Sequence, residues 1–247
     1  MKKILLSLFL SFVLVKGYSN STLNAQLYEY SAKAPATNQL EQLVAYLVKP
    51  TKSDKEKVEI FFYWISQNIK YDLELESNGQ RTWPDVAVEK TLREKKTICS
   101  GYSLLLAAMC EEVGIECQVV NGYVQYYLEA KPSKIYSNHA WNAVKIGREW
   151  KLVDATWGSG GFDYGSVEYS PNMDLRYLFA DPKFLLIDHF PLEEKWQLQK
   201  QPITFQTFLG KAYHELRFRK FNKLLDDVEY KQYLEAEKQA KEYQNKY

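Results

Sequence analysis

Hydrophobic positions follow a helical period in two stretches of this chain. Ser53 and Glu56 form a capping-box pair, and the apolar residues that follow recur three or four positions apart: Val58, Phe61, Phe62, Ile65 and Ile69. This pattern predicts a helix over residues 54–69. A second helix is predicted from Cys99 to a stop at Gly114, and it is apolar nearly all round, which is typical of a central, buried helix.

Strand-like segments follow the second helix. Residues 117–127, 140–146 and 150–156 are rich in Val, Ile, Tyr and Trp, and they predict one antiparallel sheet. Gly147 and Arg148 suit a two-residue hairpin turn with glycine first, which sets Ile146 opposite Glu149. A loop is expected at Asp181-Pro182, and helices are expected again after Pro202. The predicted fold class is therefore α+β.

The first residues have the pattern of a secretory signal peptide. Lys2 and Lys3 precede an apolar run over residues 4–15, which is too short to span a bilayer of about 30 Å. We expect a signal peptide at residues 1–25, cleaved after Ser19 or Ala25, a main domain at 26–200 and a helical C-terminal extension at 201–247. The expected location is secreted or periplasmic, without a stable membrane anchor once the signal is removed.

Composition narrows the class of protein. The chain has 247 residues, 46% of them hydrophobic and 15% aromatic, which is enough for one globular domain with a sizeable core. Its 32 basic and 31 acidic residues give a net charge of +1 without long single-sign blocks, so nucleic acid is not an expected partner. A mean hydropathy of -0.43 excludes a multispanning membrane protein.

The three cysteines lie close together in the sequence, at positions 99, 110 and 117. Cys99 is placed at the start of the second helix, where unpaired N–H groups and the helix dipole favour a thiolate. Its own amide is a candidate oxyanion donor, and Gly101 would permit close approach of a substrate. Cys110 and Cys117 either pair across the turn at Gly114 or stay reduced as core residues.

The predicted hairpin brings an imidazole and a carboxylate together. In its register Trp141 faces Asp154 and His139 faces Thr156, so His139 and Asp154 are diagonal neighbours on one face of the sheet. A general base needs such an orienting partner, and Cys99, from a helix packed on this face, would complete the set.

Two other interpretations of these residues remain open. His139 is also consistent with a strand histidine that has a backbone partner, and Asp154 with the cap of a turn before Gly158. A structural zinc site would need Cys99, His139, Asp154 and another cysteine. Cys110 cannot supply that cysteine, because eleven helical residues place it about 16 Å from Cys99.

Several motifs resemble the transglutaminase-like superfamily, in its kyphoscoliosis-peptidase-type branch. They are TICSGYS (97–103), CEEVGIE (110–116), NHAWN (138–142) and WKLVDATWG (150–158), with YWISQNIKYD (63–72), DHFP (188–191) and WQL (196–198) in support. The resemblance covers residues 55–200. It implies a papain-like α+β core with Cys99 as nucleophile, His139 as general base and Asp154 as orienter, and it implies no cofactor or metal.

The resemblance leaves the second oxyanion donor open. Trp64, Trp83 and Gln67 are candidates. Trp141 is also expected among the substrate- or oxyanion-binding residues, where it would shield the site from water, and His189 is expected to be a packing residue.

The expected activity is that of an exported cysteine peptidase or amidase. Attack by Cys99 on an amide of a protein, peptide or cell-wall substrate gives a thioester, and water then releases the product. The alternatives are an acyltransferase that cross-links proteins and a non-catalytic protein-binding module on the same fold.

Overall fold

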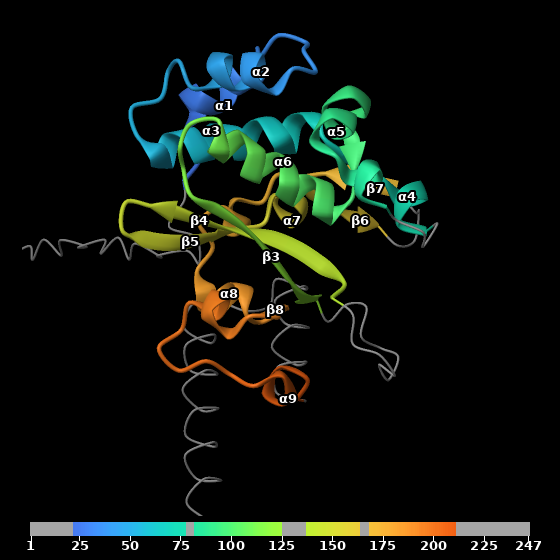
Figure 1. The fold of residues 1–247 in the computed structure, drawn as a ribbon, viewed down its shortest axis with the longest axis vertical. Coiled ribbons are helices and arrows are strands. Elements are labelled where there is room, and N and C mark those ends of the chain that lie inside the picture. Colours follow the sequence, from blue (N-terminus) through green and yellow to red (C-terminus); the bar gives the residue numbers. More distant parts are fainter. Residues whose placement is uncertain (1–21, 78–81, 125–136, 164–167, 211–247) are drawn as a thin grey trace, which may run out of the picture.

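A computed structural model of the chain describes residues 22–77, 82–124, 137–163 and 168–210 (Figure 1). Nearly all of the expected signal peptide and residues 211–247 of the expected extension lie outside these ranges. The α-helices are α1 (Ala25–Ser31), α2 (Leu40–Leu47), α3 (Asp54–Asn68), α4 (Leu73–Ser77), α5 (Val88–Glu94), α6 (Cys99–Glu111), α7 (Ala155–Ser159), α8 (Pro182–Leu185) and α9 (Phe205–Phe208). Short 3-10 helices are η1 (Trp83–Val86), η3 (Leu175–Tyr177) and η4 (Glu194–Gln197).

Four of the described strands form one antiparallel sheet, with the order β5-β4-β3-β8. Its strands are β3 (Cys117–Val124), β4 (His139–Ile146), β5 (Glu149–Val153) and β8 (His189–Pro191). Two further pairs are β1 (Lys70–Tyr71) with β2 (Lys96–Thr97), and β6 (Gly160–Asp163) with β7 (Glu168–Pro171). Helices packed on an antiparallel sheet make this an α+β fold, as predicted.

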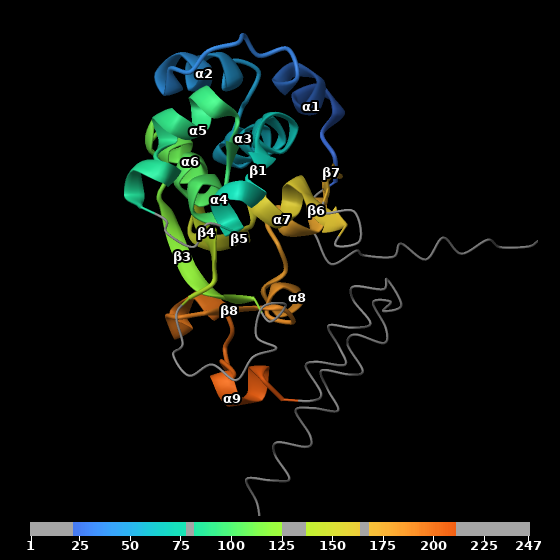
Figure 2. The ribbon, with the colours of Figure 1, turned by 90° about the vertical axis from the view of Figure 1, so that its right-hand side faces the viewer.

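The first helices cover one face of the sheet. In both views α6 lies between α3 and the sheet (Figures 1 and 2), and it packs against β3, β4 and α3. Both predicted helices are present, since α3 begins after the Ser53 cap and α6 begins at Cys99. Their buried side chains join in one core cluster, and α6 packs on β4.

The β4–β5 hairpin has the predicted register. Ile146 pairs with Glu149, and Gly147 takes the positive φ of 62° that the first position of this turn requires. The ladder ends where Asn142 pairs with Val153, because the chain leaves the sheet at Asp154 and enters α7. The predicted pairs of Trp141 with Asp154 and of His139 with Thr156 were therefore wrong.

The fourth strand, β8, was not predicted. It pairs with the far end of β3, where Val124 lies opposite His189 and Gly122 opposite Pro191. A side chain on Gly122 would lie 2.3 Å from the Phe190 carbonyl oxygen, so glycine permits this close approach.

The described chain continues beyond this sheet. Asp181 caps α8, which has Pro182 in its first turn, where only a loop was expected. After Pro202 the helix α9 forms as expected, and Phe208 packs in an aromatic cluster with Tyr123. Within the described ranges, no helix has the length and apolar character needed to cross a membrane.

Candidate active site

Cys99 is the first residue of α6. It follows Ile98, an extended residue whose side chain provides no cap for the helix. The Cys99 thiol interacts with His139, the first residue of β4, and this interaction raises the pKa of the imidazole. Both residues are buried, with 5% and 6% of their surface exposed. The packing of α6 on β4 therefore places the thiol on the side of the sheet where the imidazole begins β4.

Asp154 lies at the junction between β5 and α7. Its Oδ1 accepts hydrogen bonds from the backbone N–H groups of Thr156, at 2.8 Å, and Trp157, at 3.0 Å, and so caps α7. Its Oδ2 accepts a hydrogen bond from His139 Nε2 at 2.8 Å. The sequence suggested two separate roles for Asp154, as the cap of a turn and as the partner of His139. The carboxylate has both roles.

The electrostatics of the site favour an ion pair. Burial alone would lower the pKa of His139, but Asp154 and Cys99 outweigh it and raise that pKa to about 10. Burial would likewise raise the pKa of Asp154, but His139 and His189 hold it well below its usual range. An imidazolium beside a carboxylate is the favoured state near neutral pH.

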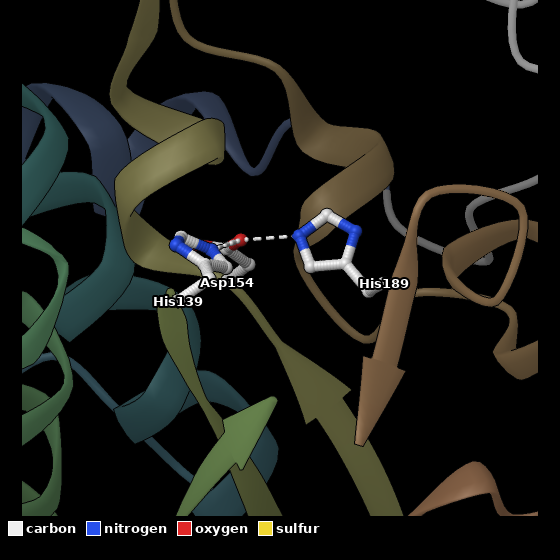
Figure 3. A group of neighbouring side chains, drawn as sticks. All are labelled: His139, Asp154 and His189. Carbon is white, nitrogen blue, oxygen red and sulfur yellow. Dashed lines mark hydrogen bonds and ion pairs between the residues drawn. The ribbon is translucent and has the colours of Figure 1, made fainter. Parts of the chain in front are cut away.

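His189 belongs to the same network and is not a packing residue alone. Its Nε2 donates to Asp154 Oδ2 at 2.9 Å, so one carboxylate oxygen lies between two imidazoles (Figure 3). The other ring nitrogen, Nδ1, is hydrogen-bonded to Asp188. The sequence signal for this role was the Asp188-His189 pair in the DHFP motif, but its position depends on the unpredicted strand β8.

Among the described residues, one cluster has side chains of the types that bind metal ions. It consists of His139, Asp154 and His189. Two ligands of a tetrahedral zinc ion are about 3.3 Å apart, given metal–ligand distances of about 2.0–2.1 Å. Here the two imidazole nitrogens lie 2.8 and 2.9 Å from Asp154 Oδ2, at hydrogen-bond distance. These distances fit shared protons better than a shared metal ion.

The tryptophans proposed for substrate or oxyanion binding have different positions. Trp141 is buried on β4 and stacks on His139, with ring centroids 5.9 Å apart and an interplanar angle of 26°. Trp64 is in the core, 4.6 Å from the Lys95 ammonium, whereas Trp83 is 79% exposed in η1. Gln67 hydrogen-bonds to residues of α1. The structure thus brings Trp141 to the site and engages Trp64 and Gln67 in other contacts.

Trp157 also contacts the site and was not predicted. Its ring lies 6.0 Å from that of His139 and 4.6 Å from that of His189, measured between centroids. With Trp141 it covers both imidazoles, which restricts contact with water.

Glycine is required at position 101 for a different reason from the one expected. A Cβ on this residue would lie 1.9 Å from Thr97 Oγ1, so the glycine lets α6 pack against Thr97. Close approach of a substrate is not needed to explain it.

The other two cysteines are close to each other. Cys110 and Cys117 are free thiols that interact with each other. This interaction, together with burial, raises the pKa of Cys110. Cys110 lies eleven residues from Cys99 along α6, so it cannot supply the fourth ligand of the zinc alternative.

Comparisons with known proteins identify a matching family model and similar proteins. Residues 41–155 match the family model described as Transglutaminase-like superfamily. The chain is 33% identical over 193 residues to Kyphoscoliosis peptidase from Homo sapiens. The matched region covers 76% of this chain and 29% of that protein. It is 28% identical over 181 residues to Hillarin from Drosophila melanogaster, covering 67% of this chain and 21% of that protein. The chain thus spans less than a third of these relatives.

A solved structure described as "Crystal structure of a TGase" is also similar. It has a TM-score of 0.39 and 17% sequence identity, over 56% of this chain and 34% of that one.

Proposed function

Because this chain belongs to the transglutaminase-like superfamily, in the branch of the kyphoscoliosis peptidases, we propose that it is a cysteine peptidase or amidase. Cys99 is the nucleophile, His139 the general base and acid, and Asp154 the group that orients His139. One observation supports this assignment above the others: the buried His139 imidazole is hydrogen-bonded to the Asp154 carboxylate and also interacts with the Cys99 thiol.

The reaction begins with transfer of the thiol proton to His139. The Cys99 thiolate attacks the carbonyl carbon of an amide, and the carbon–nitrogen bond breaks as the imidazolium gives its proton to the leaving amine. The product is a thioester on Cys99. His139 then takes a proton from water, whose oxygen attacks the thioester, and the carboxylic acid leaves as the thiolate is restored.

Asp154 has two parts in this cycle. It holds the His139 Nε2–H by a 2.8 Å hydrogen bond, which leaves Nδ1 as the ring nitrogen for the thiol. It also stabilises the imidazolium that forms when Cys99 loses its proton. The backbone N–H groups at the start of α6 are the proposed donors to the oxyanion.

The proposed substrate is an amide in a protein, a peptide or a cell wall, met outside the cytoplasm. The basic start and the apolar run over residues 4–15 support export. Asn24 caps α1, and its N–H donates to the Tyr63 hydroxyl at 3.2 Å. Of the two expected cleavage positions, the one after Ser19 is proposed, because it would retain this cap. N-terminal sequencing of the secreted protein tests both export and the cleavage site.

The reaction type is tested in ¹⁸O-labelled water that contains a fluorescent primary amine. The protein is incubated with protein, peptide and cell-wall fragments, and the products are analysed by mass spectrometry. Hydrolysis gives ¹⁸O in new carboxyl groups, whereas cross-linking chemistry gives the fluorescent amide. Cys99→Ala is expected to abolish the products and Cys117→Ser to retain them. Absence of both products from every fragment class would contradict the proposal and favour the binding module.

A further inference from the structure

His189 is held between two acidic side chains in the interior. Its side chain is fully buried, and one ring nitrogen faces Asp154 Oδ2 (Figure 3). The other ring nitrogen faces Asp188 Oδ1. A buried imidazole with both nitrogens bonded to carboxylates is costly to assemble unless the pairing is complete, as it is here.

The surrounding structure fixes the orientation of this imidazole. His189 begins β8, and its backbone pairs with Val124 of β3. The rings of Trp141, Trp157 and Tyr177 lie around it, with centroids 5.3, 4.6 and 6.1 Å away. The ring therefore has little freedom to turn away from Asp154.

The protons in these hydrogen bonds determine whether His189 acts as a donor or an acceptor toward Asp154. Asp154 Oδ2 already accepts from His139, so His189 Nε2 must carry a proton to bond to the same ionised oxygen. Another proton lies in the bond between Nδ1 and Asp188. Whichever of those two atoms holds that second proton, His189 donates an N–H to Asp154.

The charged and titratable groups that face this network come from five elements. They are Cys99 of α6, His139 of β4, Asp154 at the start of α7, Arg176 and Tyr177 of η3 with the capping residue Asp174, and Asp188 with His189 at β8.

We propose that His189, held by Asp188, is a positioning residue that fixes the Asp154 carboxylate and shares its charge with His139. The inference rests on the proposed function, in which Asp154 orients the general base. With the carboxylate divided between two donors, its hold on the His139 proton is weaker than in an isolated pair. His139 can then both keep a proton while Cys99 is ionised and release it to the leaving amine.

The substitution that removes this second donor is His189→Leu, which retains an apolar side chain of moderate size. Without the His189 N–H, the Asp154 charge falls on His139 alone. The midpoint of His139 deprotonation should therefore rise by roughly one pH unit, since a hydrogen bond to a charged group is worth about one unit or more. His189→Gln keeps a terminal N–H donor, so it should restore most of the wild-type midpoint.

Imidazole ¹⁵N spectra measure this midpoint directly. The chain has three histidines, at 139, 189 and 214, so substitution of each one assigns its signals. Leu185→Ala serves as the control for a purely structural effect, because Leu185 is buried in the same region as His189 but does not bond to Asp154. It should lower the melting temperature and leave the His139 midpoint unchanged.

The outcomes separate this inference from the proposed function. An unchanged His139 midpoint in His189→Leu, or an equal shift in Leu185→Ala, would overturn the role of His189 even if Cys99 were reactive. If Cys99 in the wild-type protein reacted like an ordinary thiol, independently of His139, the proposed function itself would fail.

Discussion

The substitution Asp154→Asn probes the hydrogen bonds that join both imidazoles to one carboxylate. If the amide oxygen keeps the bonds to the Thr156 and Trp157 N–H groups, the amide nitrogen takes the place of Oδ2. It then presents donor hydrogens to His139 and His189, whose N–H groups donate in the wild-type protein. The opposite amide orientation would instead lose the bonds that cap α7.

The expected loss of stability follows from this mismatch. Hydrogen bonds to a charged group contribute about 1.5–3 kcal/mol each, so the two lost bonds amount to about 3–6 kcal/mol. A neutral amide costs less to bury than a carboxylate, which offsets part of that loss. We expect the free energy of unfolding to fall by about 2–4 kcal/mol at pH 6.

Urea unfolding at pH 6 measures this free energy, with Asp174→Asn as the matched control. Asp174 caps η3 and pairs with Arg176 near the surface, its side chain 23% exposed. Asparagine caps helices as well as aspartate does, and a partly exposed ion pair contributes about 1 kcal/mol or less. A loss in Asp154→Asn no larger than the loss in the control would refute the account of the buried network.

Three further predictions concern packing, pH and oxidation. Gly101→Ala places a methyl group 1.9 Å from Thr97 Oγ1, so urea unfolding should show a loss of about 1–3 kcal/mol; an unchanged midpoint would contradict the packing described. The unfolded chain loses the His139 proton near pH 6.5 and the folded chain near pH 10. The His139 contribution to stability is therefore fully present below pH 6.5 and is lost as pH rises toward 10, by at most about 1.4 kcal/mol per pH unit, and His139→Gln should lack this slope in unfolding curves. Mild oxidation should join Cys110 to Cys117 and leave Cys99 free, and a peptide map with Cys99 in the disulfide would be inconsistent with the contact between the other two thiols.

Much of the site follows from local sequence signals. The Ser53 cap and the apolar spacing after it predict α3, and the Gly147-Arg148 turn predicts the β4–β5 register. That register keeps His139 and Asp154 on one face, so their contact was predicted even though the strand was extended too far. The β-forming residues after Asp154 favoured a longer strand, whereas its side chain caps a five-residue helix.

The role of His189 could not be derived in the same way. β8 has three residues, too few for an alternating pattern, and its partner strand β3 ends at Val124, far away in the sequence. Only that long-range pairing places His189 beside Asp154. Gly101 is similar, because the Thr97 side chain that it accommodates is positioned by the pairing of β2 with β1.

The central claim is that Cys99 is ionised by His139, and the pH dependence of its alkylation tests this most directly. Iodoacetamide labelling, located by peptide mass spectrometry, is compared between the wild-type protein and His139→Ala. We predict rapid labelling of Cys99 near pH 6, where an ordinary thiol with a pKa of about 8.5 is almost fully protonated, and loss of that labelling in the variant. Labelling that rises only around pH 8.5 and is the same in both proteins would contradict the account.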